Sequence, residues 1–233
     1  MKSFVPAILV FIVFLSRQSV QAQSFYALDF VENKGQWKGD FRFKTVVGNG
    51  SLFISNQGYT VLKNNPEDFS AVMEYIHGHD AEKTAPVKIT PSQKDGEPEN
   101  AVSIRAHAYH VKFVGSNQAV QYVAEKPTGE KSNYILGDDP SNWKMAVGSY
   151  GSVLGKGLYP GVDIRYYSSG DRMKYDLLLA PGADPTNIFM SYDGVDKLSI
   201  KNGHLIVSTS VGESKELPPY AYQIINGQKK EVV

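Results

Sequence analysis

The feature that most constrains the fold is a long succession of short, strand-like segments separated by turn residues, which begins at Val102. Asn202-Gly203 and Asn226-Gly227 follow apolar segments, and a type I′ hairpin turn needs two such residues with positive φ. We expect strands at 107–114, 120–124, 133–136, 162–167, 173–180, 188–192, 197–200, 205–209 and 220–225, and a last one after Gly227. Many short strands with frequent turns predict an all-β antiparallel fold, a sandwich or a barrel.

The segment 107–114 shows most clearly which side chains face the core. Tyr109, Val111 and Phe113 alternate with His110 and Lys112, which is typical of a half-buried strand. We therefore expect the three apolar side chains in the core and the two polar ones outside.

The first half of the chain also predicts strands, with one short helix. We expect a loop over 30–37, a strand at 41–47, and a hairpin formed by 51–55 and 59–63. Asn65 and Pro66 are typical of a helix start, and apolar residues at 69, 72, 73 and 76 form one stripe. This pattern predicts a helix near 66–77.

The stretch Asp80–Ala101 contains three prolines, many charges and almost no large apolar residue. It predicts a long polar surface loop that is sensitive to proteases. We expect one β-rich domain over 23–233, a sandwich-like unit with this loop as an excursion.

The N-terminus has the three parts of a signal peptide. Lys2 precedes an apolar run from Phe4 to Leu15, and Val20 and Ala22 are the small residues before a cleavage site. We expect residues 1–22 to be removed, the protein to be secreted or on the cell surface, and no membrane span to remain after cleavage. The last strand runs to the C-terminal residue with no closing turn, so we expect the natural chain to continue into further domains.

Composition excludes several classes of function. There is no cysteine, which excludes disulfides, thiolate chemistry and iron–sulfur clusters. The 24 basic side chains balance 24 acidic ones, which argues against a nucleic-acid partner. The sequence lacks Gly-x-Ser-x-Gly, His-Glu-x-x-His, a P-loop and a Rossmann fingerprint, so we expect no enzyme.

Several motifs resemble one family. They are Glu32-Asn-Lys-Gly-Gln-Trp37, His107-Ala-Tyr-His-Val-Lys-Phe-Val-Gly-Ser-Asn117, Asn133-Tyr-Ile-Leu-Gly-Asp-Asp-Pro-Ser-Asn-Trp143, Leu158-Tyr-Pro-Gly-Val-Asp-Ile-Arg-Tyr-Tyr167, Met173-Lys-Tyr-Asp176, Pro181-Gly-Ala-Asp-Pro185 and Pro219-Tyr-Ala-Tyr-Gln223. They resemble the N-terminal all-β domain of unknown function (DUF7948-like) of secreted Bacteroidota proteins. In that family the domain precedes β-propeller-like (SBBP) repeats, PKD modules and a gliding-motility or type IX secretion sorting domain. The resemblance implies no catalytic residues, and the chain shows neither the repeats nor the sorting domain.

The candidate ligand-binding residues are aromatic: Trp37, Trp143, Tyr166 and Tyr167. Such rings bind sugars by stacking, but they also fill β cores. Tyr166 and Tyr167 are adjacent in a strand, so one ring lies on each face.

Metal sites are weaker hypotheses, and we expect no cofactor. His77, His79 and Asp80 could bind zinc or nickel, but they match a solvated helix end better. Aspartates at 138, 139, 163, 184 and 193 leave a calcium site open, although their spacing fits turn chemistry.

The sequence therefore favours a non-catalytic extracellular structural or adhesion module whose partners are polysaccharides or cell-surface proteins. The alternative is a carbohydrate-binding β-sandwich used for attachment or scavenging. A glycoside-active enzyme is the third hypothesis, and its carboxylate pair cannot be located from sequence.

Overall fold

The computed structural model of the protein describes residues 28–77, 103–170 and 172–232. The strands are β1 (Phe30–Glu32), β2 (Phe43–Val47), β3 (Gly50–Ser55), β4 (Gly58–Asn64), β5 (Ala106–Val114), β6 (Gln121–Tyr134), β7 (Lys144–Tyr159), β8 (Val162–Ser169), β9 (Arg172–Leu179), β10 (Phe189–Asp193), β11 (Lys197–Lys201), β12 (His204–Thr209), β13 (Gly212–Glu216), β14 (Tyr222–Ile225) and β15 (Gln228–Glu231). The helices are α1 (Pro66–His77) and two 3-10 turns, Pro140–Asn142 and Pro185–Asn187.

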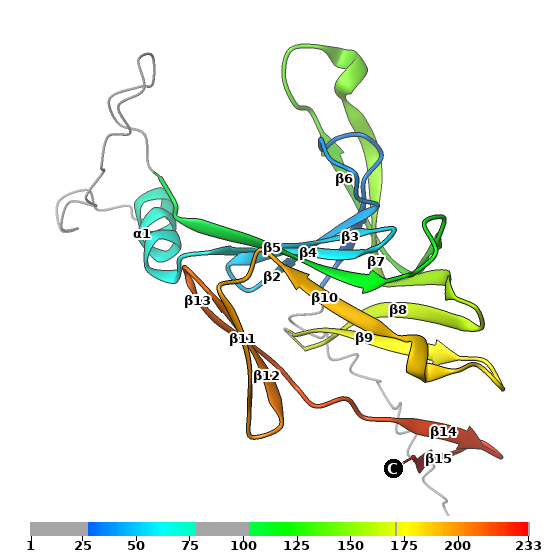
Figure 1. The fold of residues 1–233 in the computed structure, drawn as a ribbon. Coiled ribbons are helices and arrows are strands. Elements are labelled where there is room, and N and C mark those ends of the chain that lie inside the picture. Colours follow the sequence, from blue (N-terminus) through cyan, green and yellow to red (C-terminus); the bar gives the residue numbers. More distant parts are fainter. Residues whose placement is uncertain (1–27, 78–102, 171, 233) are drawn as a thin grey trace, which may run out of the picture.

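Ten strands form one antiparallel sheet in the order β10-β5-β4-β3-β2-β1-β7-β8-β9, and β6 also pairs with β7 (Figure 1). The long strand β7 is paired along both edges. Val153 of β7 pairs with Ala124 of β6 on one edge and with Tyr166 of β8 on the other. β1 lies on the same edge as β8, because Phe30 pairs with Tyr150. β7 therefore joins the two halves of the sheet.

The sheet curls until β4 and β5 face β8 and β9 across the core. The ring centroid of Tyr59 lies 6.2 Å from that of Tyr166, and the ring of Phe113 lies 6.2 Å from that of Tyr175. Buried side chains from both halves form one hydrophobic cluster between them. This is the all-β, antiparallel, sandwich-like fold that the strand pattern predicts.

The faces of β5 confirm the predicted alternation. Tyr109, Val111 and Phe113 are 3%, 0% and 2% exposed, whereas His110 and Lys112 are exposed on the opposite face. The inner face of β5 is therefore part of the core, and its outer face is exposed to solvent.

Both predicted Asn-Gly turns are confirmed. Asn202 and Gly203 have φ of 52° and 75°, and Asn226 and Gly227 have φ of 50° and 76°. These are the positive values that a type I′ turn requires.

The predicted helix is also confirmed, together with its cap. The side-chain oxygen of Asn65 accepts hydrogen bonds from the backbone N–H groups of Glu67 and Asp68, at 3.1 and 3.0 Å. Asp68 also accepts from the Arg105 guanidinium at 2.8 and 2.9 Å. Hydrogen bonding to Arg105 lowers the pKa of Asp68 to about 2.

Four strand expectations need correction. The expected loop over 30–37 begins with β1, and the two strands expected at 120–124 and 133–136 are one strand, β6. β7 and β13 were not expected at all. β6 is interrupted by register shifts against β7, so its pattern does not alternate throughout.

β7 escapes a pattern search because it contains four glycines instead of a run of β-branched residues. Gly155 of this strand pairs with Tyr122 of β6. A Cβ atom at position 155 would lie 2.7 Å from the Tyr122 ring and 3.0 Å from a methyl group of Ile164. The glycine therefore provides the space in which the tyrosine ring packs.

Two smaller sheets complete the described structure. β11, β12 and β13 form a three-stranded sheet that packs on the core through the buried Val207. Its last strand contacts the main sheet, where the Tyr192 hydroxyl donates to the Glu216 carboxylate at 2.8 Å. β14 and β15 form a separate exposed hairpin (Figure 1).

Two predictions concern residues outside the described ranges: the signal peptide over 1–22 and the polar loop over 80–101. The single-domain expectation for 23–233 stays a prediction. In the part of the chain that the structure describes, no helix has the length and apolar character needed to cross a membrane.

Candidate functional site

The loop between β1 and β2 holds Trp37 against the outer face of the sheet. The Asn33 side chain accepts from the backbone N–H groups of Gly35 and Trp37 and donates to the carbonyls of Trp37 and Phe41. The buried Gln36 side chain donates to the Glu32 carbonyl at 2.7 Å. The motif from Glu32 to Trp37 is thus a turn whose polar side chains satisfy its own backbone and fix the tryptophan.

The outer faces of four adjacent strands form a floor beside this loop. Lys44 of β2 pairs with Phe53 of β3, Phe53 pairs with Thr60 of β4, and Thr60 pairs with His110 of β5. Directly paired residues lie on the same face, so the four side chains form one row across the sheet. At its end the Thr60 hydroxyl lies 2.8 Å from Nδ1 of His110.

Aromatic rings connect the loop to the floor. The ring centroids of Trp37 and Phe41 lie 6.1 Å apart, and those of Phe41 and Phe53 lie 5.0 Å apart. The ammonium of Lys44 lies 5.1 Å from the Trp37 ring centroid and 5.8 Å from that of Phe53. Both distances are within the range of a cation–π interaction.

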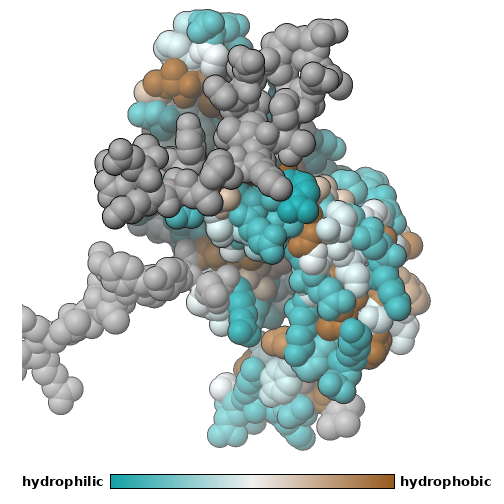
Figure 2. Space-filling view, turned by 90° about the vertical axis from the view of Figure 1, so that its left-hand side faces the viewer, coloured by the Kyte–Doolittle hydropathy of each residue, from teal (hydrophilic) through white to brown (hydrophobic). Residues whose placement is uncertain are grey.

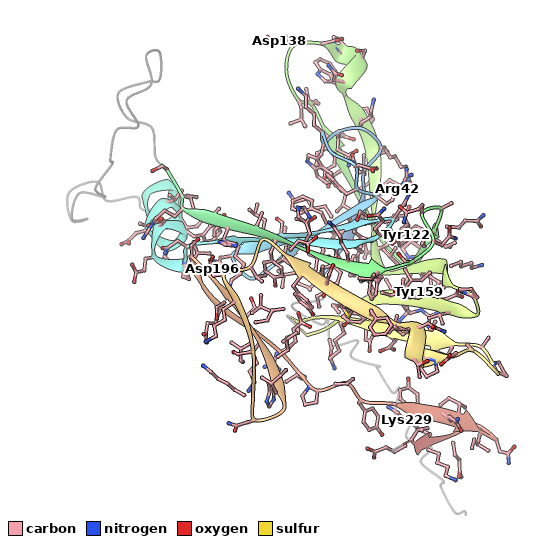
Figure 3. All side chains as sticks on the ribbon, viewed as in Figure 1. Arg42, Tyr122, Asp138, Tyr159, Asp196 and Lys229 are labelled. Atoms are coloured by element: carbon pink, nitrogen blue, oxygen red, sulfur yellow. The ribbon has the colours of Figure 1, made fainter. Side chains whose placement is uncertain are left out.

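The β6–β7 hairpin forms the second wall and rises above the body of the sheet (Figure 1). The ring of Tyr134, at the end of β6, lies 5.0 Å from Trp37 with the edge-to-face geometry that aromatic pairs prefer. In Figure 3, Arg42 lies near the foot of this hairpin and Asp138 near its tip. The contact between Tyr134 and Trp37 brings two motifs that are about 100 residues apart in sequence against each other.

The hairpin tip has its own fixed geometry. Asp139 caps the 3-10 turn at Pro140–Asn142, and hydrogen bonds from the Ser141 backbone and side chain lower the pKa of its carboxyl. The indole N–H of Trp143 donates to the Gly137 carbonyl at 3.1 Å. Trp143 therefore anchors the tip by a hydrogen bond while 37% of its surface stays exposed.

Between these parts lies a surface depression that we call the outer groove. It consists of two adjoining hollows of about 590 and 400 Å³, which share the side chains of Lys38, Phe41 and Phe53. The larger hollow is bounded by Trp37 and by Leu136 at the hairpin tip. The smaller hollow extends along the sheet to Thr60 and His110.

Exposed apolar side chains continue from the outer groove onto the raised hairpin. Ile135 and Met145 are 58% and 59% exposed. Brown, apolar atoms lie near the top of the space-filling view, at the height to which this hairpin rises (Figure 2). An exposed apolar patch beside a groove is typical of a binding surface.

The charged side chains that line the outer groove are mainly cationic. Lys38 and Lys44 line it, and Asp40 is the one carboxylate among the described lining residues. Nearby, the Arg42 guanidinium donates to the Asn56 side chain instead of to an acid.

A second group of polar side chains is enclosed between the main sheet and β13. Burial raises the pKa of Glu216, whose carboxylate accepts from Tyr192. Burial, together with the nearby charge of Glu216, raises the pKa of Tyr175 to about 12. These phenols stay protonated at neutral pH, so the group acts as part of the packed interior and offers no opening for a ligand.

The structure places the four sequence candidates differently. Trp37 lines the outer groove, and Trp143 anchors the hairpin tip whose residues bound it. Tyr166 is 0% exposed in the core, and this burial argues against a ligand contact. Tyr167 lies on the opposite face of β8, half-buried, and its hydroxyl donates to Asp176 at 3.0 Å.

Three residues that the sequence analysis did not single out are central to the outer groove: Lys44, Phe41 and Phe53. Phe53 carried a signal, because it lies between the core residues Leu52 and Ile54 and must therefore point away from the core. An aromatic residue on the solvent face of a predicted hairpin could have been selected for that reason.

No ligand cluster supports the metal hypotheses, because the described residues bring no group of three His, Asp or Glu side chains together. His107 and His110 lie on opposite faces of β5, so they cannot chelate one ion together. Asp184 caps a 3-10 turn and Asp163 accepts from the Gly157 backbone. Asp193 forms an ion pair with Lys112. The cluster of His77, His79 and Asp80 lies outside the residues whose side chains are described.

Comparison with known proteins gives one result. The family model described as a domain of unknown function, DUF7948, matches residues 30–233. Neither a curated protein nor a solved structure matches the chain.

Proposed function

Because the chain belongs to the DUF7948 family of domains of unknown function, we propose its role from its geometry: a non-catalytic extracellular adhesion module that binds glycans in the outer groove. One observation carries this proposal. Trp37, Phe41 and Phe53 converge on the larger hollow of the outer groove, about 590 Å³, on the solvent face of the sheet.

The chemistry of the outer groove suits a sugar chain. Small-ligand sites of several hundred cubic ångströms combine aromatic rings with a few polar groups that fix orientation. Here the rings supply flat apolar surfaces, and Lys38, Thr60 and His110 supply hydrogen-bonding groups along the groove. The groove is open along its length, so it suits an extended polymer better than an enclosed small molecule.

The extracellular part of the proposal depends on the signal-peptide pattern over 1–22 and on the family resemblance. We propose that the module precedes β-propeller-like repeats and a type IX secretion sorting domain in a Bacteroidota cell-surface protein. Two of the motifs that carry the resemblance, Glu32–Trp37 and Asn133–Trp143, form the two walls of the outer groove. N-terminal sequencing of secreted protein should begin at Gln23, and a different start would count against export by this route.

A glycan array with the purified protein tests the binding proposal. We expect Trp37→Ala and Phe53→Ala each to abolish binding, because each substitution removes a ring from the groove. Phe189→Ala is the matched control, since Phe189 is 61% exposed on β10 and lies outside the groove lining.

Thermal unfolding of each variant separates loss of binding from loss of folding. Glycan binding that survives both groove substitutions in folded protein would refute the proposal. Binding that is lost equally in the Phe189→Ala variant would refute it as well.

A further inference from the structure

We infer that the outer groove selects anionic glycans, polysaccharides that carry carboxylate or sulfate groups, through Lys44 and Lys38. This inference rests on the proposed function, which it narrows to one class of ligand. Both lysines line the outer groove, and neither takes part in an ion pair of the described residues.

Lys44 is a half-buried cation without an acidic partner among the described residues. Its ammonium lies above the rings of Trp37 and Phe53, and none of the four ion pairs of the described residues includes it. Cation–π contacts of this kind favour a side chain that lies along the rings. The charge of Lys44 therefore lies at the floor of the groove, beside the aromatic surface.

Lys38 is an exposed second cation where the two hollows meet. Its side chain lines both hollows and takes no part in those four ion pairs. Two lysines outside the groove lining do have acidic partners: Lys34 pairs with Glu32 at 3.7 Å, and Lys112 pairs with Asp193 at 2.6 Å. Lys38 and Lys44 therefore both line the groove without a carboxylate partner among the described residues.

A bound anionic sugar would contact both the aromatic rings and the ammonium groups of this surface. Aromatic rings pack against the faces of sugar rings, and the Lys44 ammonium beside the rings of Trp37 and Phe53 can pair with an acidic substituent of a sugar bound there. An ammonium beside an apolar surface attracts an anion more strongly than one in bulk water, because the local dielectric is lower. A neutral glycan would use the rings and leave the charges without a partner.

A single-stranded nucleic acid also combines bases that stack with an anionic backbone. The groove favours the glycan, because a nucleic-acid channel follows the backbone with many cations. Here Asp40 interrupts the cationic lining, and the whole chain carries balanced charge. A nucleic acid is therefore one arm of the test.

The test measures binding of the full chain to polygalacturonate, dextran and a thymidine oligonucleotide by titration calorimetry. We expect polygalacturonate to bind more tightly than dextran and the oligonucleotide. Its affinity should fall as salt is added. The double variant Lys38→Gln/Lys44→Gln should lose about tenfold in affinity for polygalacturonate and keep its affinity for dextran. Lys197→Gln/Lys201→Gln, which removes two exposed charges from β11, is the control and should change neither.

The outcomes separate this inference from the proposed function. Dextran binding equal to that of polygalacturonate, dependent on Trp37 and indifferent to the lysines, would overturn the anionic selectivity and leave glycan binding intact. Tighter binding of the oligonucleotide through the same lysines would overturn the inference in favour of nucleic acid. If neither polysaccharide binds to folded protein, this inference and the proposed function both fail.

Discussion

Replacing Tyr166 by phenylalanine should stabilise the protein, although the residue lies at the centre of the core. Tyr166 is 0% exposed, and its hydroxyl makes no hydrogen bond of good geometry within the described residues, although the Tyr122 phenol, which itself donates to the Ser55 carbonyl, lies nearby. Burial raises its pKa well above the ordinary value of 10.0, so the buried group remains a protonated donor. Phenylalanine keeps the ring that packs against Tyr59 and Tyr175 and removes only the unpaired atom.

The expected stabilisation by Tyr166→Phe follows from the free-energy cost of a buried hydroxyl without a hydrogen bond. An unsatisfied buried polar group costs about 1–3 kcal/mol, and the small void left by the oxygen offsets part of the gain. A net gain of about 1 kcal/mol raises the thermal midpoint of a chain of this size by about 2–4 °C. Circular dichroism during thermal unfolding at neutral pH measures this shift.

Tyr159→Phe is the matched control. The Tyr159 hydroxyl is also largely buried, but it donates to the Val114 carbonyl at 2.9 Å. Its removal should lower the free energy of unfolding by about 1 kcal/mol. If Tyr166→Phe lowers the midpoint as much as Tyr159→Phe does, the Tyr166 hydroxyl has a partner in solution, and the phenol of Tyr122 nearby is the first to test.

Three further predictions concern the core, the helix cap and the second sheet. Phe113→Ala should lower the free energy of unfolding by about 3–5 kcal/mol, whereas Lys112→Ala on the exposed face should change it by less than about 1 kcal/mol; equal effects in denaturant titrations would mean that the faces of β5 are misassigned. The pKa of Asp68, followed by NMR, should lie near 2 and return toward 3.8 in Arg105→Gln, and an unchanged value would show that the hydrogen bond is absent in solution. Burial raises the folded-state pKa of Glu216 above 4.5, so the folded protein binds this proton more tightly than the unfolded chain does and loses stability as pH rises from 4.5 through the raised value. The Glu216→Gln variant should lack this loss. Parallel curves of thermal midpoint against pH for the two proteins would contradict the raised pKa of Glu216.

Local signals in the sequence were sufficient for much of the fold. The alternation in β5 identifies its buried face, because neighbouring side chains in a strand must point in opposite directions. The turns at Asn202-Gly203 and Asn226-Gly227 depend on two adjacent residues, and the cap at Asn65 depends on three. Each of these features is determined within a few positions along the chain.

β7 could not be predicted for the opposite reason. Its glycines weaken the strand pattern, and its stability comes from partners on both edges that are distant in sequence. Gly155 is understood only when Tyr122 and Ile164 are seen packed over it. The information that makes 144–159 a strand is therefore distributed over other segments.

The candidate site was predictable in part. Trp37 and Trp143 could be chosen as aromatic residues in turn-rich segments, but their contribution to one groove depends on the pairing of β1 with β7. The hairpin of β3 and β4 would have placed Phe53 beside Thr60. Lys44 had no comparable signal, since its position over two rings is a property of the tertiary structure.

The order of the strands in the sheet has a consequence for how the protein is assembled. The strands β1 to β5 each pair with a neighbour in sequence, whereas the second edge of β1 stays unpaired until β7 forms and the second edge of β5 until β10 forms. Contacts between distant segments form slowly, because the entropy of closing the intervening loop is lost before the contact compensates for it. During synthesis the N-terminal part of the chain emerges first. The floor of the outer groove therefore forms before the β6–β7 hairpin that bounds it. Until β7 forms, the outer edge of β1 stays unpaired and the rings of Phe41 and Phe53 lack the hairpin beside them, so this is the interval in which chains are most prone to associate wrongly through an exposed strand edge.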